Sequence, residues 1–207
     1  RSGRSRARRI WEGGHALLRR ALSCSTPLLF VEITEGAGAG RQYVLFEDLP
    51  ECVPLGDEIS RCTEREGLGA RGGAIDAYIP LLASRIRSMH ETGIDHETLT
   101  ADSVLIHRQG SRCEIAFGEL ESIRIRRSVS RRRVAAALAR LECSLDSRGL
   151  LRHRHRVRFL RGYLRSRRHV EWKGFWREIA AARRHLPPGT ETARIGSIGP
   201  AGPGVRS

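Results

Sequence analysis

The alternation of apolar and polar positions predicts one helix and a hairpin in the first quarter of the chain. Residues 7–22 place apolar side chains three and four positions apart, the spacing of one helical face. The Gly13-Gly14 pair weakens such a helix by about 1 kcal/mol per glycine. Two partly β-branched runs follow at residues 28–33 and 42–46, with a glycine-rich stretch between them. We expect these runs to pair as a hairpin with a long loop.

The middle of the chain predicts a loop and then a long helix. Residues 48–73 are rich in glycine, proline and charge, so we expect a loop there. Residues 74–90 again have apolar side chains three and four positions apart, and Gly93 is placed to end that helix. Pro80 either kinks this helix or marks its true start.

A small β-rich insert is predicted beyond this helix, with strands at residues 104–107 and 113–117. Three helices follow the insert, and each is marked by an apolar face. These helices are expected at residues 134–145, 150–164 and 170–185. The tail from Pro187 has no apolar face and is predicted to be disordered.

Charge is divided unevenly along the chain. The 207 residues carry 37 Lys+Arg against 23 Asp+Glu, a net charge of +14, and Lys173 is the only lysine. Residues 21–123 have a net charge of 8 − 17 = −9, whereas residues 124–184 have 20 − 4 = +16. Arginines on adjacent helices sum to a positive field that would attract nucleic acid, anionic lipid, or phosphorylated and sulfated sugars. A solvated basic face explains the same composition equally well.

Composition excludes several classes of protein. With 40% apolar and 29% charged residues, the chain is too apolar for a disordered protein and too charged for a membrane protein. No run approaches 18 apolar residues, so no transmembrane segment is expected. The five cysteines are scattered without a C-x-x-C pair, which argues against a disulfide framework and a zinc site and favours a reducing cytosol. The basic start at Arg1 lacks the apolar core of a signal peptide and suits a fragment of a longer chain.

Three local motifs have simple structural explanations. Residues 67–72 match the phosphate-cradling pattern G-x-G-x-x-G, but the preceding residues do not predict the strand that this pattern requires, so a flexible loop is favoured. His153 and His155 lie two positions apart on a helix, so they point to different faces and cannot chelate one metal together. Both are expected to be solvated. The aromatic residues within 172–176 have the spacing of a helix packing face more than of a base-stacking surface.

The most informative stretch is residues 86–106, IRSMHETGIDHETLTADSVLI. It resembles the passage of protein-kinase-like enzymes where a helix ends in LH..GI.H and runs into HRDL....N.L. It is more closely similar to the bacterial lipopolysaccharide kinase family, the Kdo and heptose kinases of core biosynthesis. Residues 7–28 resemble that family's αC helix and next strand, 43–49 the strand entering the hinge, and 115–121 the metal-binding IDFD strand. The likeness covers residues 5–185 in one consistent order.

The resemblance implies a protein-kinase-like α+β fold. Residues 1–50 would form a small truncated N-lobe of one helix and a hairpin, residues 51–186 a mainly helical C-lobe, and residues 187–207 a disordered tail. It also implies an ancestral ATP- and Mg²⁺-dependent phosphorylation of lipid A–core sugars. The partner would be the lipopolysaccharide core or another anionic glycolipid. The protein would be cytoplasmic and peripheral to the inner membrane, where an arginine-rich lobe suits the anionic surface.

The resemblance also places the catalytic positions, and several of them have changed. Phosphoryl transfer needs a carboxylate that orients the attacking hydroxyl, and an asparagine and an aspartate that hold magnesium. His96 keeps the place of the catalytic-loop histidine, but the catalytic aspartate position is Thr98, which has no carboxylate. Ser103 stands at the metal-binding asparagine and is a poorer Mg²⁺ ligand than an amide oxygen. Glu119 stands at the metal-binding aspartate and can still bind Mg²⁺ with its longer arm.

Further residues complete the expected site. Glu47 and Leu49 fall at the hinge, where ATP would be held, and Glu12 is the acidic residue in the first helix that could pair with a strand lysine. Asp102 and Asp95 are each a few residues from the missing base. A shift of three or four residues along a tight loop moves a side chain by many ångströms, which argues against rescue by either aspartate.

Three functional hypotheses follow from these observations. The first is a degenerate kinase, a pseudokinase that retains the fold and weak nucleotide binding. The second is an arginine-rich module that binds nucleic acid or another anionic surface, with an affinity that falls steeply with salt concentration. The third is a scaffold whose docking face is the helix at residues 172–179.

Overall fold

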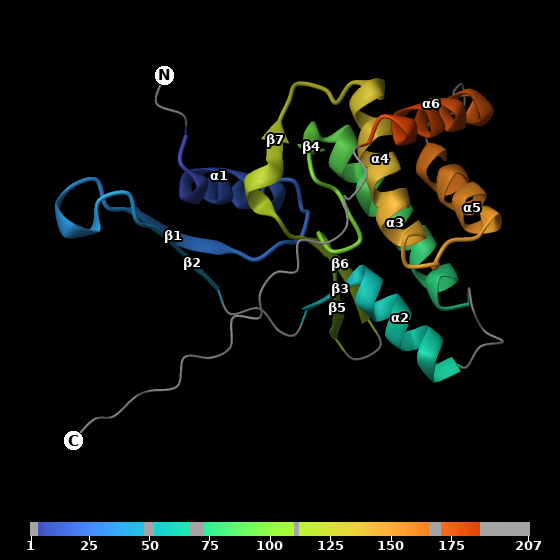
Figure 1. The fold of residues 1–207 in the computed structure, drawn as a ribbon, viewed down its shortest axis with the longest axis horizontal. Coiled ribbons are helices and arrows are strands. Elements are labelled where there is room, and N and C mark those ends of the chain that lie inside the picture. The colour runs from blue at the N-terminus through green and yellow to red at the C-terminus, as the bar shows by residue number, and fades with distance from the viewer. Residues whose placement is uncertain (1–3, 48–51, 67–72, 110–111, 166–170, 187–207) are drawn as a thin grey trace.

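The computed structural model describes residues 4–47, 52–66, 73–109, 112–165 and 171–186. A small N-terminal part, made of one helix and a hairpin, lies beside a larger part rich in helices (Figure 1). The helices are α1 (Arg6–Leu18), α2 (Leu55–Glu66), α3 (Gly73–Glu91), α4 (Arg131–Asp146), α5 (His153–Leu164) and α6 (Trp172–Arg184). The strands are β1 (Pro27–Glu32), β2 (Gln42–Phe46), β3 (Cys52–Pro54), β4 (Ile94–His96), β5 (Val104–Gln109), β6 (Arg112–Phe117) and β7 (Ile123–Ile125). Two short 3-10 turns are η1 (Gly36–Gly38) and η3 (Leu120–Ser122).

The predicted first helix is confirmed as α1, and its glycine pair explains how closely the helix packs. A Cβ atom at Gly13 would lie 2.2 Å from the carbonyl oxygen of Leu120 in η3. A Cβ atom at Gly14 would lie 2.5 Å from Cγ of Pro27 in β1. The same glycines that lower helix propensity therefore allow α1 to rest directly on η3 and β1.

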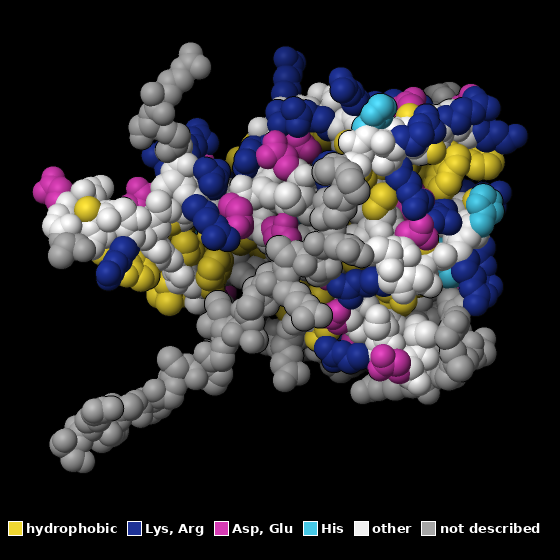
Figure 2. Space-filling model, viewed as in Figure 1, with side chains coloured by type: hydrophobic (Ala, Val, Ile, Leu, Met, Phe, Trp, Pro, Cys, Tyr) yellow, Lys and Arg dark blue, Asp and Glu magenta, His cyan; other side chains and the backbone are white. Residues whose placement is uncertain are grey.

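The predicted hairpin is confirmed as β1 and β2, which pair antiparallel. Leu29 lies opposite Leu45 and Val31 opposite Tyr43, so these four side chains share one face. That face is open, since their exposed fractions run from 41% to 57%. On the other face, the ring centroid of Phe30 lies 5.6 Å from that of Trp11 in α1. Figure 2 shows the exposed apolar side chains of the hairpin as a yellow patch.

The expected loop at residues 48–73 is wrong in its centre, where α2 forms. Leu55, Ile59 and Cys62 follow one another at helical spacing, and Leu55 and Ile59 are buried in the core. Asp57 and Glu58 lie in the first turn, where acidic side chains favour a helix. The glycines that suggested a loop are concentrated after the helix, and the G-x-G-x-x-G motif lies outside the described residues.

The long central helix is confirmed as α3, and Pro80 lies inside it, so the alternative that the helix starts at Pro80 is wrong. Gly93 ends the helix with a φ of +80°, a conformation that glycine adopts without strain. Its N–H donates to the carbonyl of His90 at 3.2 Å.

The β-rich insert is also confirmed, and its strands belong to two small sheets. Strands β5 and β6 form one antiparallel sheet with β3, which precedes α2, and β4 pairs antiparallel with β7. Figure 1 shows this insert between the hairpin side and the helices. The pairing of β4 with β7 fixes the position of the chain segment that follows β4, which carries the residues of interest.

The three C-terminal helices appear where the sequence predicted them, and they build the core with α3. Tyr163 of α5 is 1% exposed, and its ring stacks on those of Phe159 and Phe175, each with centroids 6.1 Å apart. Phe175 and Ile179 of α6 are each 3% exposed. The packing face predicted for this helix is confirmed. The hypothesis that this helix docks a partner stays a prediction, since Phe175 and Ile179 are buried within the chain while Trp172 is 38% exposed.

His155 corrects one prediction about the basic surface. The side chain is 1% exposed rather than solvated, whereas His153 is exposed as expected. Its Nδ1 accepts a hydrogen bond of 3.1 Å from the backbone N–H of Arg152, and its Nε2 lies 3.9 Å from a carboxylate oxygen of Asp76. Burial lowers the pKa of His155, so it serves as a neutral packing group at the start of α5.

Candidate functional site

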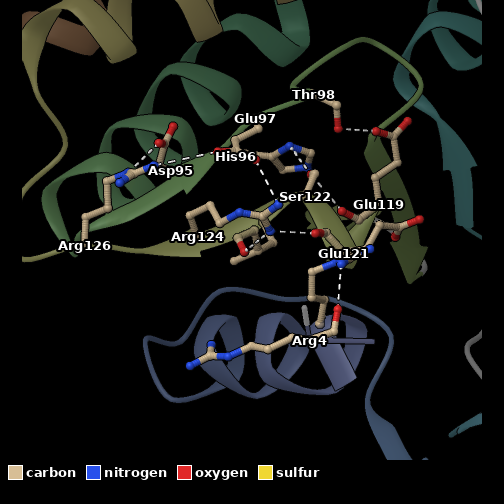
Figure 3. A network of polar contacts seen from close by, with 12 residues as sticks. Arg4, Asp95, His96, Glu97, Thr98, Glu119, Glu121, Ser122, Arg124 and Arg126 are labelled. Atoms are coloured by element: carbon tan, nitrogen blue, oxygen red, sulfur yellow. Dashed lines mark hydrogen bonds and ion pairs between the residues drawn. The ribbon is translucent and has the colours of Figure 1, made fainter. Parts of the chain in front are cut away.

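The segment after β4 and the turn after β6 meet in one place, as Figure 3 shows. The N–H of Gly118 donates to the carbonyl of Ser103 at 2.8 Å, and the N–H of Glu97 donates to the carbonyl of Ser122 at 3.1 Å. These backbone bonds hold residues 96–103 against residues 118–122. The structure therefore brings together the four predicted positions, which are His96, Thr98, Ser103 and Glu119.

His96 forms the buried floor of the site and is 0% exposed. Its Nε2 lies 3.1 Å from the carbonyl oxygen of Gly118, and its Nδ1 lies 3.0 Å from the hydroxyl of Ser122. A carbonyl only accepts, so Nε2 carries the proton. Nδ1 of the neutral ring and the carbonyl of Glu119, which lies 2.8 Å from the Ser122 hydroxyl, compete for the single proton of that hydroxyl. Burial lowers the pKa of His96 to about 4, and the nearby positive charge of Arg140 acts in the same direction. His96 is thus a neutral positioning group that joins β4 to the turn after β6.

The buried neutral His96 predicts that the protein loses stability in acid. In the unfolded chain the histidine pKa is near 6.5, so between pH 6.5 and 4 the unfolded state binds a proton that the folded state excludes. We expect the contribution of His96 to fall by about 1.4 kcal/mol for each pH unit in this window as the pH is lowered. Urea unfolding at pH 7.0, 6.0 and 5.0 measures the slope. H96N should flatten it, whereas H153N, at an exposed histidine, should not, and equal slopes in all three proteins would contradict the prediction.

Thr98 and Glu119 face each other at the open side of the site (Figure 3). The hydroxyl of Thr98 donates a hydrogen bond to the carboxylate of Glu119. Glu119 is partly exposed and has φ +47° and ψ 49°, in the left-handed region. The two positions that the resemblance assigns to the catalytic aspartate and to the metal-binding aspartate therefore lie in contact. The carboxylate at this spot is supplied by Glu119.

Ser103 is placed inside the loop and does not reach toward Glu119. The side chain is 1% exposed, and its oxygen accepts from the N–H of Thr100 at 2.8 Å. The hydroxyl lies 3.1 Å from the carbonyl of Thr100 and 3.3 Å from that of Thr98. These contacts let Ser103 shape the loop between β4 and β5.

Both aspartates near the missing base are held by arginines. Asp95 is 2% exposed and bonds to Nε of Arg126 at 2.7 Å and Nη1 of Arg133 at 2.9 Å. Asp102 lies 2.5 Å from Nη2 of Arg148, at the end of α4. Neither carboxylate contacts Thr98 or Glu119 in the part of the chain that the structure describes.

The remaining predicted residues lie away from this cluster. Glu12 bonds to Arg4 at 2.7 Å and Arg8 at 3.0 Å, so its partners come from its own end of α1. Glu47 is exposed, and its backbone N–H extends the hairpin by donating to the carbonyl of Thr26 at 2.9 Å. Leu49 lies outside the described residues.

The side chains of this site supply one carboxylate for Mg²⁺, which is fewer ligands than a metal site made by the protein alone requires. No three His, Cys, Asp or Glu side chains are grouped to hold a metal ion within the described ranges. Mg²⁺ in nucleotide sites is held by one or two carboxylates together with the phosphates and water. Glu119 supplies one such carboxylate, while the Ser103 hydroxyl bonds within its loop. Any Mg²⁺ here would therefore be held mainly by the phosphates of a bound nucleotide.

Two arginines of the α4 region are part of this site although the sequence did not single them out. Arg133 closes the ion pair of Asp95, and Arg140 lowers the pKa of His96 through its charge. The pKa of Arg140 is itself lowered by burial, against the attraction of Asp95 and Glu97. The sequence did not distinguish these two arginines from the many others in residues 124–184. The burial of Asp95, which calls for paired cations, is seen only in the structure.

No protein-family model and no curated protein sequence matches the chain. Solved structures do match it, among them one titled "WaaP in complex with acyl carrier protein". The two structures align with a TM-score of 0.63 and 22% sequence identity, over 85% of this chain and 71% of the other. This chain has a WaaP-like fold. The protein-kinase-like fold, of the lipopolysaccharide-kinase type, that the sequence predicted is thereby confirmed.

The order of the observed elements agrees with the one that the sequence resemblance implies. An N-terminal helix with a hairpin, a long helix and a β-rich insert precede a helical end. The boundaries at residues 50 and 186 stay predictions. No helix among the described residues has the length and apolar character to span a bilayer.

Proposed function

We propose that this chain is a lipopolysaccharide-kinase-like pseudokinase that has kept the fold and lost phosphoryl transfer. The observation that carries the proposal is the placement of carboxylates around Thr98. The two aspartates near it in sequence are bound by arginines, and the carboxylate that touches Thr98 belongs to Glu119. A general base must lie within hydrogen-bond reach of the hydroxyl that it activates. Neither aspartate is free to take that role.

Residual nucleotide binding is part of the proposal. Glu119 would hold Mg²⁺ together with the phosphates of ATP, and Thr98 would orient that carboxylate through its hydroxyl. The metal, when bound, would neutralise charge on the phosphates. His96 would keep the two backbone segments in register without exchanging a proton, because its pKa is about 4. The hinge residues Glu47 and Leu49 are proposed to lie beside the nucleotide base.

The proposed partner is an anionic glycolipid such as the lipopolysaccharide core, bound by a cytoplasmic protein at the inner membrane surface. Figure 2 shows Lys and Arg side chains spread over the helical part of the visible face. Several of them are already paired, since Arg156 and Arg183 both bond to Glu142 and Asp146. This pairing reduces the charge free to bind either anionic partner, and the resemblance to the lipopolysaccharide kinases favours the glycolipid over the arginine-rich nucleic-acid module.

The first test is a thermal-shift titration with ATP, with and without Mg²⁺. We expect a Mg²⁺-dependent stabilisation that E119A removes, because ligand at 100 times its Kd adds about 2.7 kcal/mol. E121Q is the matched control, because Glu121 lies two residues away and pairs with Arg6 at 2.6 Å. No transfer of phosphate from ATP to a core saccharide is expected. Mg²⁺-dependent transfer that E119A abolishes would show an active kinase and overturn the pseudokinase proposal.

A further inference from the structure

A groove between α1 and β7 is lined by four arginines and one carboxylate. Arg4 precedes α1, Arg9 and Glu12 lie in α1, Arg124 lies in β7, and Arg126 directly follows β7. The apolar part of the lining is Gly13, Ile123 and Ile125. The groove encloses about 390 Å³. Sites for small organic molecules occupy roughly 300–1,000 Å³, so the space suits a ligand larger than a simple ion.

The helix side of the groove carries one arginine, Arg9, without a carboxylate partner in the described chain. Glu12 already accepts from Arg4 at 2.7 Å and from Arg8 at 3.0 Å. Arg9 donates from Nη1 to the carbonyl of Arg4 at 2.8 Å, and no carboxylate pairs with it among the residues that the structure describes. A partly buried guanidinium beside a hollow, without a counter-ion, is favourably placed to receive an anion.

On the strand side, the two arginines are held by hydrogen bonds that use only some of their N–H groups. Arg124 bonds through Nη1 to the carbonyls of Glu121 at 2.7 Å and Ile123 at 3.1 Å, and through Nη2 to Glu97 at 3.0 Å. Arg126 bonds through Nε to Asp95 at 2.7 Å. A guanidinium has five N–H donors, so these contacts fix each side chain and leave two or more donors free of partners in the described chain.

We propose that this groove binds a phosphate monoester, with the guanidinium groups of Arg9, Arg124 and Arg126 as its ligands. The planar fork of a guanidinium matches two oxygens of a phosphate. The lining residues carry four positive charges against the one negative charge of Glu12. Arg124 and Arg126 also pair with Glu97 and Asp95 outside the lining, so Arg9 supplies the guanidinium without a carboxylate partner in the described chain. Ile125 is 53% exposed at this groove and offers an apolar contact for the organic part of the ligand. The site is separate from Thr98 and Glu119, needs no Mg²⁺ and does not depend on the proposed function.

Binding there would tie α1 to the segment that follows Glu119. Helix α1 already packs on η3 at Gly13. Because glycine has no side chain, the helix backbone lies directly against the carbonyl of Leu120. A phosphate held by both α1 and β7 would add a second connection across the same interface. The ligand would therefore stabilise the position of the turn that carries Glu119.

Isothermal titration calorimetry with glucose 6-phosphate, without Mg²⁺ and at ionic strength fixed with NaCl, tests the proposal. We expect saturable binding that R9Q weakens at least tenfold, since Arg9 makes one backbone contact and the fold should tolerate its loss. R161Q is the matched control, because Arg161 is an exposed arginine of α5 without a partner in the described residues. E119A should bind as the natural protein does, which separates this site from the nucleotide site.

Vesicles of phosphatidylcholine with 20% phosphatidic acid provide the second arm, because a lipid headgroup presents the same phosphate chemistry. Vesicle binding that R9Q abolishes, without binding of glucose 6-phosphate, would assign the site to a lipid phosphate. Binding of glucose 6-phosphate would assign it to a soluble ligand. Absence of binding in both arms would overturn the proposal, as would equal weakening by R9Q and R161Q. R124Q serves as the second variant if R9Q melts at a lower temperature than the natural protein.

Discussion

Replacing Asp95 by alanine is expected to destabilise the protein by about 1.5–3 kcal/mol. The carboxylate is 2% exposed and neutralises Arg126 and Arg133, at 2.7 and 2.9 Å. Its loss would take two charge-assisted bonds away and leave Arg133 without its counter-ion, next to the partly buried Arg140. The cost stays moderate because Arg126 and Arg133 are 31% and 47% exposed, and Arg126 keeps Glu97 at 3.7 Å. The free energy of unfolding, measured by urea titration at pH 7, gives the value.

The control for this prediction is E178A. Glu178 bonds to Nε of Arg131 at 2.7 Å, but both side chains are more than 40% exposed. An exposed ion pair contributes less than about 1 kcal/mol, so this variant should remain close to the natural protein. A loss below 1 kcal/mol in D95A would mean that the arginines find other partners. The ion pairs of Asp95 would then contribute no more to the free energy of unfolding than an exposed pair does.

Replacing Gly93 by alanine is the second change with a large expected effect, about 2–5 kcal/mol. The φ of +80° costs an alanine roughly 1–2 kcal/mol. Its Cβ would also lie 2.2 Å from the carbonyl oxygen of Arg126, and overpacking of this kind costs roughly 1–3 kcal/mol. The carbonyl is fixed because the N–H of Arg126 donates to Gly93 at 2.8 Å. Thermal and urea unfolding would measure the loss.

Gly149 separates the two causes. Its φ is +67°, yet a Cβ atom added there would have no neighbouring atom within 4 Å, so G149A suffers the backbone strain alone. We expect G149A to cost about 1–2 kcal/mol. Equal losses in G93A and G149A would show that the contact with Arg126 relaxes, and that only the backbone conformation matters at Gly93.

The sequence predicted most elements because their apolar faces are regular. The helices α1, α3, α4, α5 and α6 and the strands β1, β2, β5 and β6 all follow from spacing. Helix α2 was missed because the glycines just after it outweighed the spacing of Leu55, Ile59 and Cys62. Composition averaged over 26 residues concealed a boundary that only the local pattern could place.

The family resemblance named the members of the candidate site, and their roles stay predictions. The structure places His96, Thr98 and Glu119 on adjoining segments and turns the side chain of Ser103 into its own loop. The bond from Thr98 to Glu119 depends on the left-handed turn at Glu119, which no spacing rule predicts for a glutamate. The arginine partners of Asp95 lie 31 and 38 residues away along the chain, beyond the reach of local patterns.

The division of charge along the sequence now has a structural explanation. Ion pairs cross from the acidic part to the basic part at several points, which are Asp57 and Asp102 with Arg148, Asp76 with Arg154 and Arg158, and Asp95 and Glu97 with Arg126. Each pair joins a carboxylate before residue 124 to an arginine after it. The arginine run therefore serves in part to dock the two halves of the chain, and its full charge is not available to outside partners.

The left-handed backbone at Glu119 bears on how this protein could change over generations. Aspartate and asparagine occupy that conformation more readily than most side chains. A single step from glutamate to aspartate would thus keep the carboxylate and shorten its arm without reshaping the turn. The backbone at this position therefore accepts either acidic side chain, and the length of the carboxylate arm is free to vary over generations.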